Sequence, residues 1–194
     1  MKIRTILRLG AIVTMLTAIG FTFGEFIYFF GAADTVLFSW VFITVVMLQV
    51  FAIMALYAAQ VKRGNVFLLI GFVLLIINFI LALMNHMGDL GVVTGLLSQA
   101  QLEKAGQISI FVVLGAVKDW TWPLGFVILG FGTVRAGVFS RWSGVLLALL
   151  GVTILFRDFW IIEYIFAALS FATWAWFGLA LWKKASDLAQ DVTL

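Results

Sequence analysis

The stretch ISIFVVLGAVKDWTWPLGFVILGFGTV, residues 108–134, is apolar over a length that can cross a lipid bilayer. It nevertheless contains Lys118 next to Asp119, and it also contains Pro123, the single proline of the chain. A charged side chain at the centre of a membrane span costs roughly 3 kcal/mol on insertion scales. A membrane helix that keeps two such charges and a helix breaker therefore requires partners for them or a use for them.

The composition of the whole chain indicates an integral membrane protein. Of its 194 residues, 64% are hydrophobic and 11% are charged. The absence of cysteine and the presence of a single histidine exclude a disulfide framework, a cysteine-ligated metal and a haem held by two histidines. Any other cofactor is unknown. The net charge of +3 is not a nucleic-acid signature, because the basic residues follow the membrane topology.

Six apolar stretches predict an all-α bundle of six transmembrane helices. They cover residues 9–30, 36–59, 66–85, 108–134, 143–156 and 160–182. The fifth is short for a hydrocarbon core of about 30 Å, so its ends are the least defined. We expect residues 1–184 to form the transmembrane domain and residues 185–194 to form a short cytoplasmic tail.

The basic residues predict the orientation of this bundle. Nine of the twelve lysines and arginines fall on one side of a six-pass layout. The positive-inside rule places that side, and with it both termini, in the cytoplasm. The nine residues are Lys2, Arg4, Arg8, Lys62, Arg63, Arg135, Arg141, Lys183 and Lys184.

The longest connection, residues 87–107, joins the third and fourth spans. Its first half contains GDLGVVTG, which is rich in glycine and predicts a flexible loop. Its second half predicts a short helix, because Ser98 and Gln101 have the spacing of a capping box. We expect this helix to lie at the outer membrane surface.

Polar side chains recur in the outer half of four predicted spans. Because a polar group that faces lipid is unfavourable, we expect these groups to converge on one cavity, where they bind a ligand or relay protons. They are Glu25 in the first span, directly after the helix-packing motif Gly20-xxx-Gly24, Asn78 in the third, Lys118, Asp119 and Trp122 in the fourth, and Glu163 in the sixth.

Two further features could control access to such a cavity. Pro123 removes a backbone N–H and should kink the fourth span, which would free the carbonyl of Asp119. Arg157 and Asp158 form the short outer turn between the fifth and sixth spans, where they would lie at the cavity mouth. The alternatives are a kink whose charges pair for structural reasons and a simple polar turn.

The single histidine, His86, follows the third span. A lone histidine at a helix end more often makes interfacial hydrogen bonds than binds a metal, although a site shared with Glu25, Glu163 or Asp119 is left open. A Ser–His–Asp triad would need this histidine, and no nucleophile-elbow motif accompanies it.

Two segments carry a resemblance to a known family. They are AIGFTFGEF at residues 18–26 and the region 97–159, which contains LSQAQLEKAG at 97–106 and a longer stretch from Pro123 onward. In these segments the chain resembles a bacterial multi-pass inner-membrane family catalogued only as a domain of unknown function. The family pattern has a histidine or polar residue near the start of the fourth span, where this chain has KDWTWP. The resemblance implies a protein of the bacterial cytoplasmic membrane and no particular activity.

Three functions fit these features. The first is a protein that binds or transports a small polar or ionic ligand, or protons, through a charged cavity in the outer half of the bundle. The second is an accessory or scaffold subunit of a larger membrane complex or homo-oligomer. The third is an intramembrane enzyme that uses paired carboxylates, and we lean against enzymatic activity. In each case the lipid bilayer is the surrounding partner, and no nucleic acid is expected.

Overall fold

The computed structural model describes residues 3–31, 35–156 and 159–190, and this part of the chain contains helices and no strand. The predicted all-α class is confirmed. The helices are α1 (Ile3–Phe29), α2 (Val36–Gln60) with a 3-10 turn η1 (Val61–Arg63), α3 (Val66–Val93), α4 (Gln99–Gly106), α5 (Ser109–Ala136), α6 (Arg141–Ile154) and α7 (Trp160–Gln190).

Five of these helices, α1, α2, α3, α5 and α7, are long and apolar enough to cross a membrane. The sixth predicted span corresponds to α6, which has 14 residues. At 1.5 Å per residue this helix is about 21 Å long, which is shorter than a hydrocarbon core of about 30 Å. The fold is that of a multi-pass membrane protein with five full-length apolar helices and one shorter apolar helix among the described residues.

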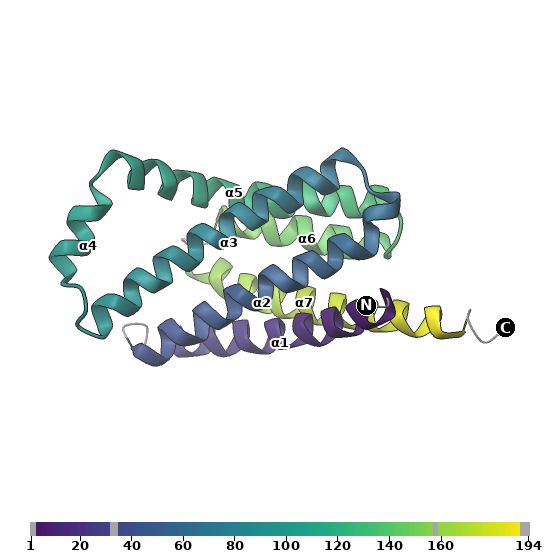
Figure 1. Ribbon diagram of the computed structural model, residues 1–194, viewed down its shortest axis with the longest axis horizontal. Coiled ribbons are helices and arrows are strands. Elements are labelled where there is room, and N and C mark those ends of the chain that lie inside the picture. The colour runs from purple at the N-terminus through teal and green to yellow at the C-terminus, as the bar shows by residue number, and fades with distance from the viewer. Residues whose placement is uncertain (1–2, 32–34, 157–158, 191–194) are drawn as a thin grey trace.

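The helices form an elongated bundle with two unlike ends (Figure 1). α1 packs against α2 and α7, α3 packs against α2 and α5, and α6 packs against α5 and α7. The beginning of α1 and the end of α7 lie at one end, which we call the terminal end (Figure 1). α4 lies at the opposite end, which we call the α4 end. Toward the α4 end, α3 and α5 diverge and α4 connects them, whereas α6 and the beginning of α7 stop short of it (Figure 1).

Glycines bring α3 and α5 into direct backbone contact in the half of the bundle nearer the terminal end. A Cβ atom at Gly71 would lie 2.6 Å from the Cα of Leu129, and one at Gly132 would lie 2.7 Å from the Cα of Leu68. No side chain fits at either position, so these two glycines are required for the observed separation of the helices. The contact is extended by Asn65, whose side-chain amide donates a hydrogen bond of 3.0 Å to the carbonyl of Gly132.

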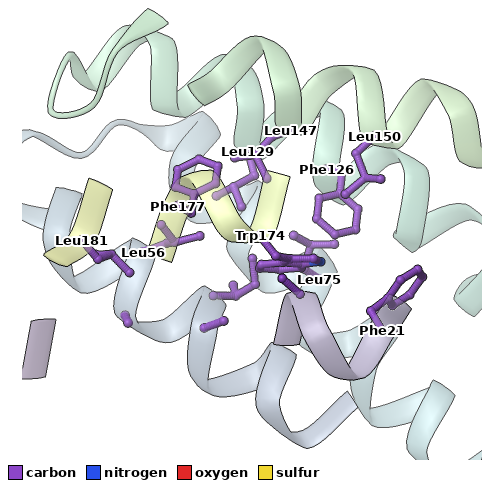
Figure 2. Packing of buried hydrophobic residues seen from close by; sticks show 14 of the residues in the cluster. Phe21, Leu56, Leu75, Phe126, Leu129, Leu147, Leu150, Trp174, Phe177 and Leu181 are labelled. Atoms are coloured by element: carbon purple, nitrogen blue, oxygen red, sulfur yellow. The ribbon is translucent and has the colours of Figure 1, made fainter. Parts of the chain in front are cut away.

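The hydrophobic core fills this half of the bundle around Trp174 of α7 and reaches the cavity-lining residue Phe21 of α1 (Figure 2). Trp174 is 1% exposed, and its ring meets the ring of Phe126 of α5 at 6.1 Å in an edge-to-face arrangement. Leu75 of α3 and Leu147 of α6 are fully buried in the same cluster. Because α7 lies against this cluster, the core joins the α3–α5–α6 side of the bundle to the α1–α2 side.

The connection between α3 and α5 differs from the predicted one. The expected flexible loop at GDLGVVTG is instead largely helical, because α3 continues to Val93. Gly88 and Gly91 lie in this added segment, where a Cβ would come close to Leu102 and Leu97. These glycines therefore permit close packing of the following segment and do not mark a loop. The predicted capping box is present, with Ser98 and Gln101 bonded to each other's backbone N–H groups at 3.2 and 2.8 Å.

Candidate functional site

The candidate site lies where α3 and α5 separate. Asn78 of α3 is 2% exposed, and its side-chain amide donates a hydrogen bond of 2.8 Å to the carbonyl oxygen of Lys118 on α5. Between this bond and α4 the two helices diverge (Figure 1). A cavity of about 340 Å³ opens there, with walls formed by α1, α2, α3 and α5. This is the volume range of small-molecule sites.

One face of α3 supplies most of the polar wall. Asn78, Asn85, His86 and Asp89 recur at intervals of seven, one and three residues, which places them along one side of a helix. α2 adds Gln49, which is 5% exposed. Oxygen and nitrogen atoms therefore line the cavity from its buried end at Asn78 to its open end at Asp89.

The charged groups of the cavity are paired loosely. The Lys118 ammonium lies 3.4 Å from a carboxylate oxygen of Asp119, and His86 Nδ1 lies 3.7 Å from a carboxylate oxygen of Asp89. Two aspartates thus face one lysine, and the cavity carries a net negative charge when the histidine is neutral. The side chains of Asp89 and Asp119 are 56% and 70% exposed, so both can interact with an incoming ligand.

Aromatic rings form the remaining wall. Six of them line the cavity, namely Phe21, Tyr28, Phe38, Phe42, Phe79 and Trp122. Phe42 is central among them, because its ring lies 4.6 Å from that of Phe38, 5.2 Å from the imidazole of His86 and 6.3 Å from that of Phe21. The site therefore combines carboxylates and amides on α2, α3 and α5 with aromatic rings from α1, α2, α3 and α5.

The structure brings together four of the six residues predicted to bind a ligand or relay protons. Asn78, Lys118, Asp119 and Trp122 line one cavity, and His86 joins them. The predicted convergence thus holds for the third and fourth spans. It extends to the second span, in which no site residue was predicted.

Glu25 and Glu163 do not line this cavity. Glu25 is 1% exposed and lies one turn beyond Phe21 on α1. On α7, Glu163 lies three residues before Phe166, whose ring contacts that of Phe21 at 5.6 Å. Both residues therefore lie close in sequence to a ring contact between α1 and α7. The single cavity that the sequence predicts therefore does not include these two residues among the side chains that line it.

Pro123 is buried and does not interrupt α5, which is one continuous helix from Ser109 to Ala136. α6 packs onto it, since a Cβ at Gly151 would lie 2.6 Å from the carbonyl oxygen of Pro123. The carbonyl oxygen of Lys118 accepts two side-chain hydrogen bonds. One comes from the amide of Asn78 and the other, of 3.2 Å, comes from the hydroxyl of Thr121. The other two residues predicted at the cavity mouth, Arg157 and Asp158, lie outside the described residues.

A second crevice adjoins the cavity. It has a volume of about 340 Å³ and lies between α3, α4 and α5, and it shares Asn85, Asp89 and Lys118 with the first cavity as lining residues. Its remaining lining is mostly apolar and includes Leu81, Met84, Leu102, Phe111 and Leu114. In the part of the chain that the structure describes, no three histidine, aspartate or glutamate residues gather into a metal-binding group. The open alternative of a metal at His86 has no support from this geometry.

Sequence reasoning missed Gln49 and Asp89. Gln49 is an amide inside an apolar run, which is the same signal that identified Asn78, and it could have been found by the same criterion. Asp89 was assigned to a solvated loop because the third span was expected to end at residue 85. The helix continues past that point and places Asp89 on the face of Asn78 and Asn85. The aromatic wall gives no sequence signal of its own, because the chain contains 20 phenylalanines.

Comparison with known proteins gives no further guide to the site, because no family model, no curated protein and no solved structure matches the chain. The fold and the apolar helices define the class, a multi-pass membrane protein.

Proposed function

We propose that this protein binds a small polar or ionic ligand, and carries it or protons into the membrane, through the cavity between α1, α2, α3 and α5. The observation that supports this proposal most strongly is the cavity itself. Hydrophilic side chains from α2, α3 and α5 surround a space of about 340 Å³ inside an apolar bundle. In a membrane protein such groups are unfavourable unless they serve a pathway or a ligand.

The proposal includes an orientation. We infer a six-pass protein of the bacterial cytoplasmic membrane, with α6 as the fifth and shortest pass and both termini in the cytoplasm. The positive-inside rule supports this, since η1, the end of α5 and the beginning of α6 carry Lys62, Arg63, Arg135 and Arg141 on the same side of the six-pass layout. The cavity then opens on the outer side, and α4 lies at the outer membrane surface. The resemblance of residues 18–26 and 97–159 to a bacterial inner-membrane family agrees with this placement.

A cavity-filling variant tests the binding function. Ala82 of α3 lines the cavity and is partly buried, so Ala82→Phe places a ring inside the space. Ala116 of α5 is exposed outside it, so Ala116→Phe is a control with the same change in volume and hydrophobicity. The protein would be purified in nanodiscs, and its melting temperature measured with tetramethylammonium, acetate, inorganic phosphate and acetamide.

A ligand that binds the folded state raises the melting temperature by mass action. We expect at least one of the four compounds to stabilise the wild type and Ala116→Phe but not Ala82→Phe. If none stabilises the wild type, or if Ala82→Phe responds as the wild type does, the cavity is not a binding site for these classes. Mass spectrometry of small molecules that co-purify with the wild type and are lost in Ala82→Phe provides a second readout.

A second candidate function is supported by a different surface. Because α6 stops short of the α4 end (Figure 1), the first part of α5 has no neighbour on that side, and Ile110, Val112, Val113 and Trp120 are each at least 57% exposed. An accessory subunit would use this surface to contact a larger partner. Affinity purification from native membrane would then recover a partner in fixed stoichiometry, and Val113→Lys would release it without changing the response of the cavity to ligand.

A further inference from the structure

The composition of the cavity wall narrows the class of ligand. We propose that the cavity holds the head of a cationic amphiphile, an organic ammonium group, and that the adjoining crevice between α3, α4 and α5 holds its hydrocarbon chain. This inference rests on the proposed binding function and specifies its ligand. It is argued from three features of the walls: the excess of carboxylate, the aromatic rings and the apolar crevice.

The charge of the cavity favours a cation. Asp119 is within 3.4 Å of Lys118, whereas among the described residues the ion pair of Asp89 is with a histidine, at 3.7 Å. The carboxylate of Asp89 is 56% exposed and lines both the cavity and the crevice. An anionic ligand would be repelled by two aspartates and attracted by one lysine. A cation would instead balance the negative charge of Asp89, which the lysine does not neutralise.

The aromatic rings favour an organic ammonium over a metal ion. A cation is attracted to the face of an aromatic ring within about 6 Å, and rings grouped around a cavity are a known means of recognising alkylated ammonium groups. Phe38, Phe42 and Trp122 line the cavity from two different helices. A small metal ion requires several oxygen or nitrogen ligands at close range, and no group of three acidic or histidine residues is gathered among the described residues.

The crevice extends the site in one direction. It meets the cavity at Asn85, Asp89 and Lys118, and beyond these residues its lining becomes leucine, methionine and phenylalanine. Gly115 also lines it, and a Cβ at this position would have no neighbour within 4 Å. An unfilled apolar crevice next to a charged cavity matches an amphiphile whose polar head and apolar chain are covalently joined.

The test compares three soluble compounds on the protein in nanodiscs. Octyltrimethylammonium has both the head and the chain, tetramethylammonium has the head alone, and octyl sulfate has the chain with an anionic head. Binding is measured by calorimetry or by the change in melting temperature. We expect octyltrimethylammonium to bind more tightly than either of the other two, because only it satisfies both parts of the site.

Two pairs of variants separate the contributions to the head. Trp122→Leu removes one aromatic face and should weaken octyltrimethylammonium binding roughly tenfold, a typical effect of a desolvated cation–π contact. Trp122→Phe should restore most of this loss. Trp142→Leu is the matched control, because Trp142 is 69% exposed and lies outside the cavity.

Asp89→Asn should also weaken binding of both ammonium compounds, whereas Asp187→Asn, on an exposed turn of α7, should not.

Another variant tests the site of the hydrocarbon chain. Gly115→Phe fills the crevice and should weaken octyltrimethylammonium while leaving tetramethylammonium unchanged. Octyl sulfate could bind more tightly than octyltrimethylammonium, with this binding abolished by Ala82→Phe. In that case the cavity binds a ligand as proposed, but the proposal that the head of the ligand is an ammonium group is overturned. If Ala82→Phe affects none of the compounds, both proposals fail. If Gly115→Phe weakens the two ammonium compounds equally, the crevice does not hold the chain.

Discussion

Helices α3 and α5 behave differently in their two halves. In the half nearer the terminal end, Gly71 and Gly132 allow the two backbones to touch and the space around them is filled by the core of Trp174 and Phe126. In the half nearer the α4 end, the same two helices diverge (Figure 1). A cavity and a crevice lie in this half. Asn78, bonded to the carbonyl of Lys118, marks the point at which one arrangement gives way to the other.

The difference shows how a chain with few charged residues can build a polar site in a membrane. Close packing of small residues provides the stability of the bundle, because apolar side chains gain little from leaving lipid for a protein interior. Once that packing holds one half together, the other half is free to separate and to place carboxylates, amides and rings around a space. The short α6 contributes to this separation, because its glycine contacts with α5, from Pro123 to Val134, lie in the half nearer the terminal end.

The largest effect is expected from adding a methyl group to the glycine contact. Gly132→Ala would place a Cβ 2.7 Å from the Cα of Leu68, and since the backbone cannot move aside easily, we expect a loss of about 2–3 kcal/mol in the free energy of unfolding. Gly115→Ala on the same helix is the control. It meets no atom within 4 Å and should stabilise the helix by up to about 1 kcal/mol. Unfolding in mixed detergent micelles measures both, and equal effects would show that the two halves are not packed differently.

A smaller effect is expected at the junction of the two halves. Asn78→Ala removes a buried hydrogen bond between α3 and α5 and should lower the free energy of unfolding by about 1 kcal/mol, within the range measured for such bonds in membrane proteins. Asn85→Ala, seven residues further along the same face and exposed, should have little effect. If Asn85→Ala proved as destabilising as Asn78→Ala, the boundary between the halves would be misplaced.

The smallest effect is expected at α4. Ser98→Ala removes the hydroxyl that accepts the N–H of Gln101 and should destabilise this helix by about 0.5–1 kcal/mol. Because α4 makes few contacts with α3 and α5, the melting temperature of the whole protein should barely change. Amide hydrogen exchange within residues 99–106 should become faster. Unchanged exchange there would mean that contacts with Leu97 and Leu102, and not the cap, hold α4.

Much of the fold could be predicted from the sequence. Long apolar stretches bounded by polar residues gave the transmembrane helices, and the Ser98–Gln101 spacing gave the cap of α4. The end of α3 could not be predicted in the same way, because Gly88 and Gly91 are typical of loops and here serve packing against Leu102 and Leu97. Hydropathy reports only where lipid ends, whereas a helix can continue into the aqueous layer as long as its backbone hydrogen bonds continue.

The candidate site was predictable only in part. The polar groups of α3 and α5 were identified because a charge or an amide stands out in an apolar helix. The direction in which each helix faces was not available from the sequence. Glu25 and Glu163 therefore appeared equivalent to Asp119, although Asp119 lines the cavity and the two glutamates do not. The aromatic wall depends on how α1, α2 and α5 are arranged around α3, which no local pattern encodes.

The most direct test of this account is the accessibility of two engineered cysteines in intact membranes. The chain has no cysteine of its own, so Ala82→Cys, on the cavity wall, and Ala52→Cys, 0% exposed in the core of the other half, each provide a unique thiol. We predict that a membrane-impermeant, water-soluble maleimide added from the outer side labels Ala82→Cys and leaves Ala52→Cys unmodified. Failure to label Ala82→Cys, or equal labelling of both, would contradict the claim that α3 and α5 separate around a water-filled site.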